Sequence, residues 1–116
     1  MKIGILGTAD IAFRRFLPAL QTCPGVEYIG VASRTPEKTE QFVKAYGGMG
    51  YPSYQALLED ERVEAVYVPL PPALHYEWGK KVLLSGKHLF MEKPFATSQT
   101  EAEELLQLAE ERGLAV

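Results

Sequence analysis

Residues 2–12 of the chain read KIGILGTADIA, an apolar run that is closed by a glycine and followed at once by a segment of helical character. The run predicts a buried β-strand over Lys2–Leu6, and the spacing of apolar residues within Ile11–Thr22 predicts a helix. A strand, a glycine turn and a helix in direct succession are typical of β-α-β units with parallel strands. This stretch therefore predicts the fold class, and the remaining segments extend the pattern.

The same alternation of short apolar runs and helix-length segments continues to the end of the chain. Ser98-Gln-Thr-Glu101 is a capping box, and Gly86 and Gly113 are placed to end helices. Because the strands are apolar throughout, we expect a doubly wound parallel α/β sheet of the Rossmann type. Further strands are expected at Tyr28–Ala32, Gly50–Pro52, Ala65–Val68 and His88–Met91, and further helices after Thr35, after Ser53, at about Ala73–Ser85 and up to Arg112.

Composition limits the classes of protein to which the chain can belong. The 116 residues are 47% hydrophobic and 23% charged, which is the balance of one globular domain, and the net charge of −3 argues against a general nucleic-acid binder. Cys23 is the single cysteine, so a disulfide framework and a multi-cysteine metal site are excluded. No apolar run approaches the roughly 18 residues of a membrane span, and Met1–Asp10 has no signal-peptide character. We expect a cytoplasmic protein without a metal, nucleic-acid or membrane partner.

The glycine turn after the first strand has the pattern of a phosphate-binding turn. Gly7-x-Ala9-x-x-Ala12 matches Gly-x-Gly-x-x-Gly/Ala, in which the first position makes the tight turn and the last lets the helix pack closely on the strand. Ala9 departs from the pattern, because its methyl group stands where backbone should approach phosphate. Alone the signal is weak, since Gly7 could simply end a strand. The residues expected to contact a coenzyme pyrophosphate are Gly7, Thr8, Ala9, Asp10 and Ile11.

The end of the second predicted strand indicates which coenzyme is bound. NAD sites usually have an acidic residue there for the ribose hydroxyls, whereas an arginine accommodates the 2′-phosphate of NADP. This chain has Ser33 and Arg34 at that point, with Lys38 one turn into the next helix. A hydroxyl, a guanidinium and an ammonium together favour NADP(H) over NAD(H). The alternative is a solvated Arg34 and Lys38 without a ligand.

A proline-rich turn follows the fourth predicted strand. Pro69-Leu70-Pro71-Pro72 stiffens the backbone at the same edge of the sheet. His75 and Trp78 follow on the next helix, and such residues are more often part of the core or surface than of a site.

The fifth predicted strand is followed by Glu92-Lys93-Pro94. An ammonium at this point can donate a hydrogen bond to a substrate oxygen and stabilise developing negative charge, while Glu92 orients or neutralises it. The alternative is a surface Glu-Lys pair of little energetic consequence.

Together these features resemble the N-terminal half of the Gfo/Idh/MocA oxidoreductase family. The resemblance covers nearly the whole chain and rests on the Gly7 turn, the proline turn ending in His75, Gly86-Lys87-His88 and Glu92-Lys93-Pro94. Within the family, Ala32-Ser33-Arg34 and Val68-Pro69-Leu70-Pro71 are most similar to the NADP-dependent sugar 3-ketoreductases and to the dihydrodiol and D-xylose dehydrogenases. Alanine at position 9 is common in these branches.

The resemblance implies roles for individual residues. Lys93 is expected to act on the substrate oxygen near nicotinamide C4, with Glu92 and Pro94 holding its turn. Pro69, Leu70, Pro71 and His75 are expected to border the nicotinamide ribose, and Ser33, Arg34 and Lys38 to take the 2′-phosphate. Arg14 or Arg15 could reach the pyrophosphate or substrate, while the other is solvated.

The resemblance also implies that the chain is incomplete. Leu114-Ala115-Val116 begins another apolar run, which we expect to be a sixth strand cut short. Residues 1–116 are then one NAD(P)-binding domain, and an absent C-terminal domain is expected to carry much of the sugar-like substrate's pocket, a second acid or base and a homo-oligomer interface. Two other classes stay open: a non-catalytic NADP-binding sensor, and a nucleoside- or metal-dependent enzyme on the same fold, for which the sequence has no motif.

Overall fold

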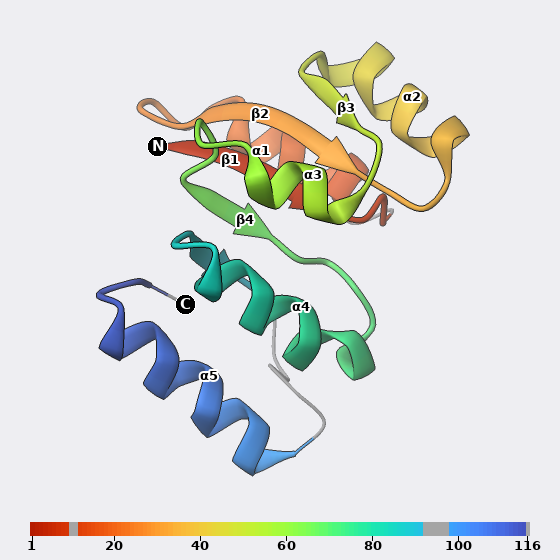
Figure 1. Cartoon of the computed structure of the whole chain (residues 1–116). Helices are drawn as coiled ribbons and strands as arrows, with labels where there is room; N and C mark the ends of the chain where they lie inside the picture. The colour runs from red at the N-terminus through yellow and green to blue at the C-terminus, as the bar shows by residue number, and fades with distance from the viewer. Residues whose placement is uncertain (10–11, 92–97, 116) are drawn as a thin grey trace.

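Five parallel strands form one sheet in the order β3-β2-β1-β4-β5 (Figure 1). The structure is a computed structural model that describes residues 1–9, 12–91 and 98–115. Both neighbours of β1 run parallel to it, and the outer pairs are also parallel. The predicted doubly wound α/β fold is therefore confirmed. The strands are β1 (Lys2–Leu6), β2 (Glu27–Ala32), β3 (Met49–Tyr51), β4 (Ala65–Tyr67) and β5 (His88–Phe90).

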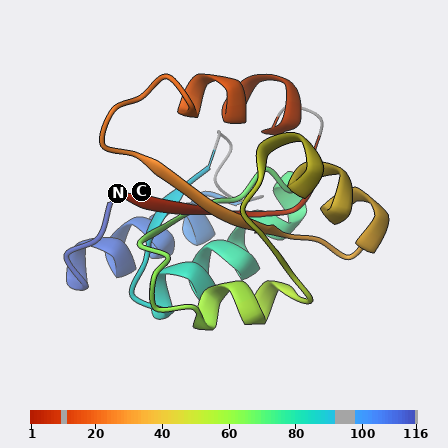
Figure 2. The same cartoon turned by 90° about the horizontal axis from the view of Figure 1, so that it is seen from above.

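Helices cover both faces of the sheet (Figure 2). They are η1 (Ala12–Phe16), α1 (Leu17–Leu20), α2 (Pro36–Tyr46), α3 (Tyr54–Glu59), α4 (Pro72–Leu84) and α5 (Gln99–Glu111). Each predicted helix is present, with ends shifted by one or two residues. β4 and β5 end one residue earlier than predicted, although the Val68 amide still donates to the Phe90 carbonyl at 2.9 Å.

The sheet separates two hydrophobic cores. Ile3, Ile5 and Val31 point to the face covered by η1, α1 and α2, where they pack with Leu17 and Phe42. Residues of alternate register face the other side, and the core there is completed by α3, α4 and α5. Its buried members include Leu6, Ala32, Leu57, Val66, Val68, Val82, Leu83, Leu89 and Leu105. The apolar strands are thus buried on both faces, as a parallel sheet requires.

The first helix differs from the prediction. Residues 12–16 form a π-helical turn, and α-helical geometry begins only at Leu17. Pro18 has no amide hydrogen to donate to the carbonyl four residues earlier, so regular α-helical bonding is interrupted at this place. The wider turn is held from α2, where the Tyr46 hydroxyl donates to the Phe13 carbonyl and the two rings meet edge to face at 5.2 Å.

Serine caps fix the starts of two helices. Ser53 Oγ accepts the Ala56 amide at 3.1 Å, and Ser98 Oγ accepts the Glu101 amide at 3.1 Å, as predicted. Thr35 occupies the N-cap position of α2, but its side chain makes no capping bond.

The last described residues lie beside the outer edge of β5. The Leu89 amide donates to the Ala115 carbonyl at 2.9 Å, and the Ala115 amide donates to His88 Nδ1 at 3.0 Å. No strand is formed by residues 114–115, and Val116 lies outside the described residues, so the sixth strand stays a prediction. Among the helices that the structure describes, none combines the length and apolar character needed to cross a membrane.

Candidate functional site

The turn after β1 is anchored to the end of β2. Gly7 is buried and has a φ of +105°, a backbone conformation that residues other than glycine rarely adopt. Its amide donates to the Ala32 carbonyl at 2.7 Å. Ala12 is fully buried, and its amide donates to the Ala9 carbonyl at 3.1 Å. Tight turn and close helix packing, the two features that the motif predicted, are both present.

Two hydroxyls link the turns after β1 and β2. Thr8 Oγ1 lies 3.0 Å from Ser33 Oγ, and the same serine oxygen accepts the Thr35 amide at 3.0 Å. Ser33 therefore also fixes the backbone that leads into α2, in addition to any ligand contact. The predicted phosphate turn and the predicted 2′-phosphate residues lie together at one edge of the sheet.

The proline turn after β4 packs against the glycine turn. A Cβ atom built on Gly7 would lie 2.8 Å from Leu70 Cδ2, so Leu70 occupies the space that a side chain at position 7 would need. Three turns, after β1, β2 and β4, thus meet at the carboxyl edge of the sheet. This is the edge at which open α/β sheets bind their ligands.

His75 of α4 holds the proline turn by a hydrogen bond. Its ring is buried at 5% exposure, and Nε2 bonds the Leu70 carbonyl at 2.7 Å. Because a carbonyl only accepts, Nε2 carries the hydrogen of that bond. The expectation that His75 borders a ligand stays a prediction, and the hydrogen bond to Leu70 shows that His75 also helps to hold the proline turn.

Arg34 and Lys38 are both exposed at the end of β2 and the start of α2. The Arg34 guanidinium carbon lies 6.0 Å from the ring centre of Tyr54, the first residue of α3. Tyr54 in turn meets Trp78 of α4 edge to face at 4.8 Å. Burial raises the pKa of Tyr54, and the charge of Arg34 opposes that rise.

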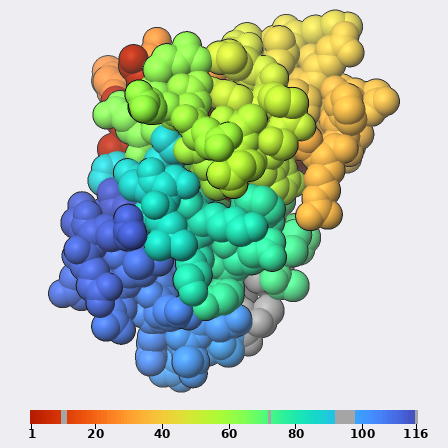
Figure 3. All heavy atoms as spheres, viewed as in Figure 1, coloured from red at the N-terminus to blue at the C-terminus, as the bar shows by residue number. Residues whose placement is uncertain are grey.

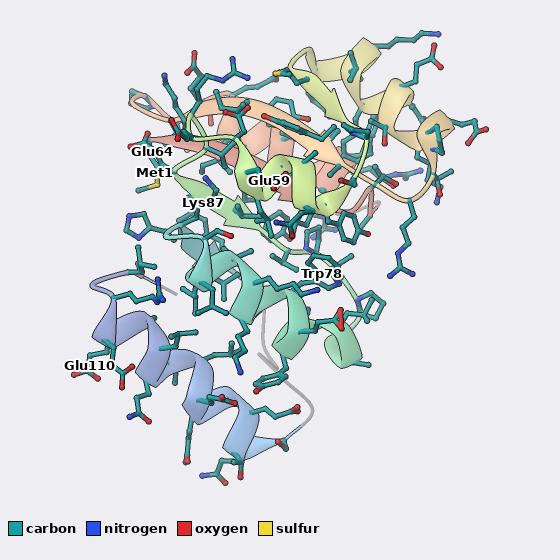
Figure 4. The ribbon with its side chains drawn as sticks, viewed as in Figure 1. Met1, Glu59, Glu64, Trp78, Lys87 and Glu110 are labelled. Carbon is teal, nitrogen blue, oxygen red and sulfur yellow. The ribbon has the colours of Figure 1, made fainter. Side chains whose placement is uncertain are left out.

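The sequence reasoning missed Tyr54 as a residue of this edge. The available signal was its position directly after the Ser53 cap, because the segment that follows β3 begins at the same edge of the sheet as the other turns. Trp78, expected to belong to the core, packs half-buried against it. In Figure 4 Trp78 lies between α3 and α4, away from Lys87 and Glu64, which lie near the amino ends of the strands.

The remaining predicted site residues are either exposed on η1 or outside the described residues. Arg14 and Arg15 are exposed on η1. β5, which precedes the Glu-Lys-Pro motif in the chain, lies next to β4, whose end carries the proline turn. Asp10, Ile11, Glu92, Lys93 and Pro94 lie outside the described residues.

One cavity opens beside Ser33. It measures about 300 Å³ and lies between α2 and β3, with Pro36, Val43 and Tyr51 in its lining. Among residues 1–9, 12–91 and 98–115, no group of three or more histidine, cysteine or acidic side chains is placed to hold a metal ion.

A parallel sheet with this strand order, and a glycine turn leading from β1 into the first helix, defines a dinucleotide-binding domain of the Rossmann type. Comparison with known families agrees. All of residues 1–116 match the GFO_IDH_MocA family, described as an oxidoreductase family with an NAD-binding Rossmann fold. The chain belongs to this family.

The chain is similar to several curated relatives. It is 46% identical over 114 residues to dTDP-3,4-didehydro-2,6-dideoxy-alpha-D-glucose 3-reductase of Actinomadura kijaniata, covering 98% of this chain and 34% of the relative. It is 35% identical over 117 residues to D-xylose 1-dehydrogenase (NADP(+)) 2 of Haloferax volcanii, covering 100% of this chain and 36% of the relative.

A solved structure has the same fold. KijD10, a 3-ketoreductase from Actinomadura kijaniata crystallised with NADP and TDP-benzene, superposes with a TM-score of 0.95 at 46% identity, over 98% of this chain and 35% of that one. The chain spans about a third of the length of the relatives that it matches.

Proposed function

We propose that the chain is the coenzyme-binding part of an NADP(H)-dependent oxidoreductase acting on a sugar-like substrate. The observation that carries this is the meeting of three turns at the carboxyl edge, with Ser33 and Arg34 at the end of β2 where an NAD enzyme usually has an acidic residue. The similarity to a dTDP-sugar 3-reductase and to an NADP-dependent xylose dehydrogenase supports the same function.

The described residues fit a dinucleotide phosphate. Gly7 presents backbone without a side chain, and the hydroxyls of Thr8 and Ser33 lie 3.0 Å apart beside it. Arg34 is exposed and can turn its charged fork toward a phosphate dianion. Lys38, on the first turn of α2, adds a second positive charge.

When bound, the coenzyme supplies or accepts a hydride at nicotinamide C4. The chain's own contribution, on this proposal, is to hold the coenzyme and to act on the substrate oxygen. Lys93 is the residue proposed for the second task, where a hydrogen bond from its ammonium stabilises negative charge on that oxygen. Glu92 and Pro94 are proposed to hold Lys93, and the proline turn with His75 to border the coenzyme ribose.

The same proposal includes a second domain beyond Val116 that completes the substrate pocket and forms a homo-oligomer interface. A D-xylose or dihydrodiol dehydrogenase is the second candidate within the class, favoured by the 35% identity to the xylose dehydrogenase. Reduction of a nucleotide-linked 3-ketosugar and oxidation of D-xylose, measured on the same preparation of the whole protein, distinguish the two candidates.

Titration with both coenzymes tests the coenzyme assignment. We expect the chain to bind NADPH more tightly than NADH in isothermal calorimetry. Arg34→Ala should weaken NADPH by about 1–3 kcal/mol, because charge-assisted hydrogen bonds to phosphate are lost, and should leave NADH nearly unchanged. Arg112→Ala, which removes an exposed arginine at the end of α5, is the matched control. Equal affinities in the parent chain, or a preference for NADH, would contradict the assignment.

A further inference from the structure

Tyr54 occupies a fixed position at the coenzyme edge. It is the first residue of α3, directly after Ser53, whose hydroxyl caps the helix at the Ala56 amide. The cap and the short connection from β3 leave the start of α3 little freedom. The ring is half-buried and packs against the core formed by α3, α4 and α5. α3 and α4 meet side by side on this face of the molecule (Figure 3).

The ring of Trp78 packs against the ring of Tyr54. The two rings meet at right angles with 4.8 Å between their centres, which is the edge-to-face geometry that aromatic pairs favour. On Trp78 lies the ammonium of Lys81, 4.3 Å from its ring centre. Trp78 Nε1 is buried and makes no hydrogen bond within the described part of the chain. Trp78 therefore supports Tyr54 through ring packing.

In front of Tyr54 lies the guanidinium of Arg34. Its Cζ is 6.0 Å from the ring centre, at the outer limit of a cation–π contact. Arg34 is exposed, and an arginine side chain has many rotamers, most of which would point its charge away from a ligand. A cation–π contact with a ring that is packed against Trp78 would favour the rotamers that keep the guanidinium beside Tyr54, before any coenzyme binds. Ordering of Arg34 in the free protein would lower the entropy cost of coenzyme binding.

We propose that Tyr54 is a positioning residue that sets the preference for NADPH over NADH by holding the Arg34 guanidinium at the carboxyl end of β2. The proposal rests on the proposed function, because it assigns Arg34 to the 2′-phosphate. The ring carries the role, and the hydroxyl does not. Tyr54 acts only through Arg34.

Two variants of Tyr54 separate the ring from the hydroxyl. Tyr54→Leu should raise the Kd for NADPH about two- to five-fold, the range expected for loss of an exposed cation–π contact, and leave the Kd for NADH unchanged. Tyr54→Phe, which keeps the ring, should behave as the parent. The NADH titration also reports whether each variant is folded. An equal loss of NADPH and NADH affinity in Tyr54→Leu would overturn the proposal, since it would indicate a general disturbance of the site.

A matched control uses another tyrosine and cation pair, which lies on α4. Lys80 Nζ lies 5.5 Å from the ring centre of Tyr76 on α4, where the Tyr76 hydroxyl bonds Glu104 of α5. Tyr76→Leu removes a tyrosine–cation contact within α4 and a hydrogen bond from α4 to α5, and should leave the ratio of the two coenzyme affinities unchanged. A shifted ratio in this variant would show that the readout is not specific to Arg34, and would overturn the proposal.

The double variant tests whether Tyr54 acts through Arg34. In an Arg34→Ala background, Tyr54→Leu should have no further effect on NADPH binding, and an added loss would overturn the proposal. The variants distinguish a wrong coenzyme assignment from a wrong role for Tyr54. If Arg34→Ala leaves the NADPH preference intact, the coenzyme assignment fails and this proposal fails with it. If Arg34→Ala removes the preference while Tyr54→Leu keeps it, only the role of Tyr54 fails.

Discussion

At the scale of single residues, Gly7 shows how one backbone conformation holds two loops together. Its φ of +105° turns the chain after β1, and the missing side chain leaves room for Leu70 of the proline turn. The positive φ and the close approach of Leu70 both disfavour a residue with a side chain at position 7. Mutations can separate the energetic cost of the positive φ from the cost of the collision with Leu70.

Gly7→Ala should destabilise the fold and weaken coenzyme binding. The positive φ alone costs about 1–3 kcal/mol for a residue with a side chain, and the new methyl group would collide with Leu70 at 2.8 Å. Gly25→Ala is the control, because Gly25 also has a positive φ of 83° but nothing within 4 Å of the added Cβ. Urea denaturation should show a larger loss for Gly7→Ala than for Gly25→Ala. If the losses are equal, the contact with Leu70 has no energetic importance, and adding Leu70→Ala should then bring no recovery.

Local motifs predicted some residues of the candidate site, and Tyr54 was not among them. The turn after β1 and the Ser33 and Arg34 pair were visible because glycine spacing and strand ends are local features of the chain. Tyr54 was missed because its ring reaches Arg34 only through the order of the strands, which places the ends of β2 and β3 side by side. His75 was assigned to a ligand, and its bond to the Leu70 carbonyl could not be read from the sequence.

At the scale of elements, Asp60 joins β3 to the connection between α3 and β4. Its Oδ2 accepts the Tyr51 hydroxyl at 2.5 Å and Arg62 Nη2 at 2.8 Å, and its Oδ1 accepts Arg62 Nε at 3.1 Å. The hydrogen bonds from Arg62 and Tyr51 hold the pKa of Asp60 well below its usual value. Lys87, almost fully buried, donates to the carbonyls of Asp60 and Val63, and burial lowers its pKa.

The stability of the protein should therefore depend on pH in the acid range. Because the pKa of Asp60 is lower in the folded protein than its ordinary 3.8, its contribution is complete above that value and is lost as the pH falls below it. Asp60→Asn should be less stable than the parent at pH 7, and the difference should shrink by pH 3 in urea denaturation. Glu59→Gln, an exposed acid at the end of α3, is the control. A difference that stays constant from pH 7 to pH 3 would argue against the ionised Asp60.

The sequence predicted which segments are helices and strands better than it predicted their local geometry. Caps such as Ser53 and Ser98 fix helix starts by a contact three residues away, so the sequence predicts them well. The π-helical turn before Leu17 was not predicted, because it depends on Pro18 and on the hydroxyl of Tyr46 from a different helix.

At the scale of the whole molecule, the chain corresponds to about a third of its relatives, so substrate chemistry is proposed for a longer protein. In that protein Lys93→Ala should lower kcat by about 10²–10⁴-fold, the contribution of a positioned proton donor, with little change in the Kd for NADPH. Steady-state kinetics and a coenzyme titration on the same sample measure both. Lys44→Ala, which removes an exposed lysine of α2, should leave kcat unchanged. An unaltered kcat in Lys93→Ala would remove its assigned role.

The central place of β1 has a consequence for how the protein is made. β1 is the first strand of the chain but lies in the middle of the sheet, with β2 on one side and β4 on the other. During synthesis from the N-terminus, the second edge of β1 stays unpaired until residues 65–67 emerge. The hydrophobic cluster that contains Leu6 is completed only later, because Val82 and Leu83 of α4 also belong to it. An unpaired strand edge beside an uncovered apolar face is a place where nascent chains aggregate. Truncations that end before β4 should therefore be insoluble.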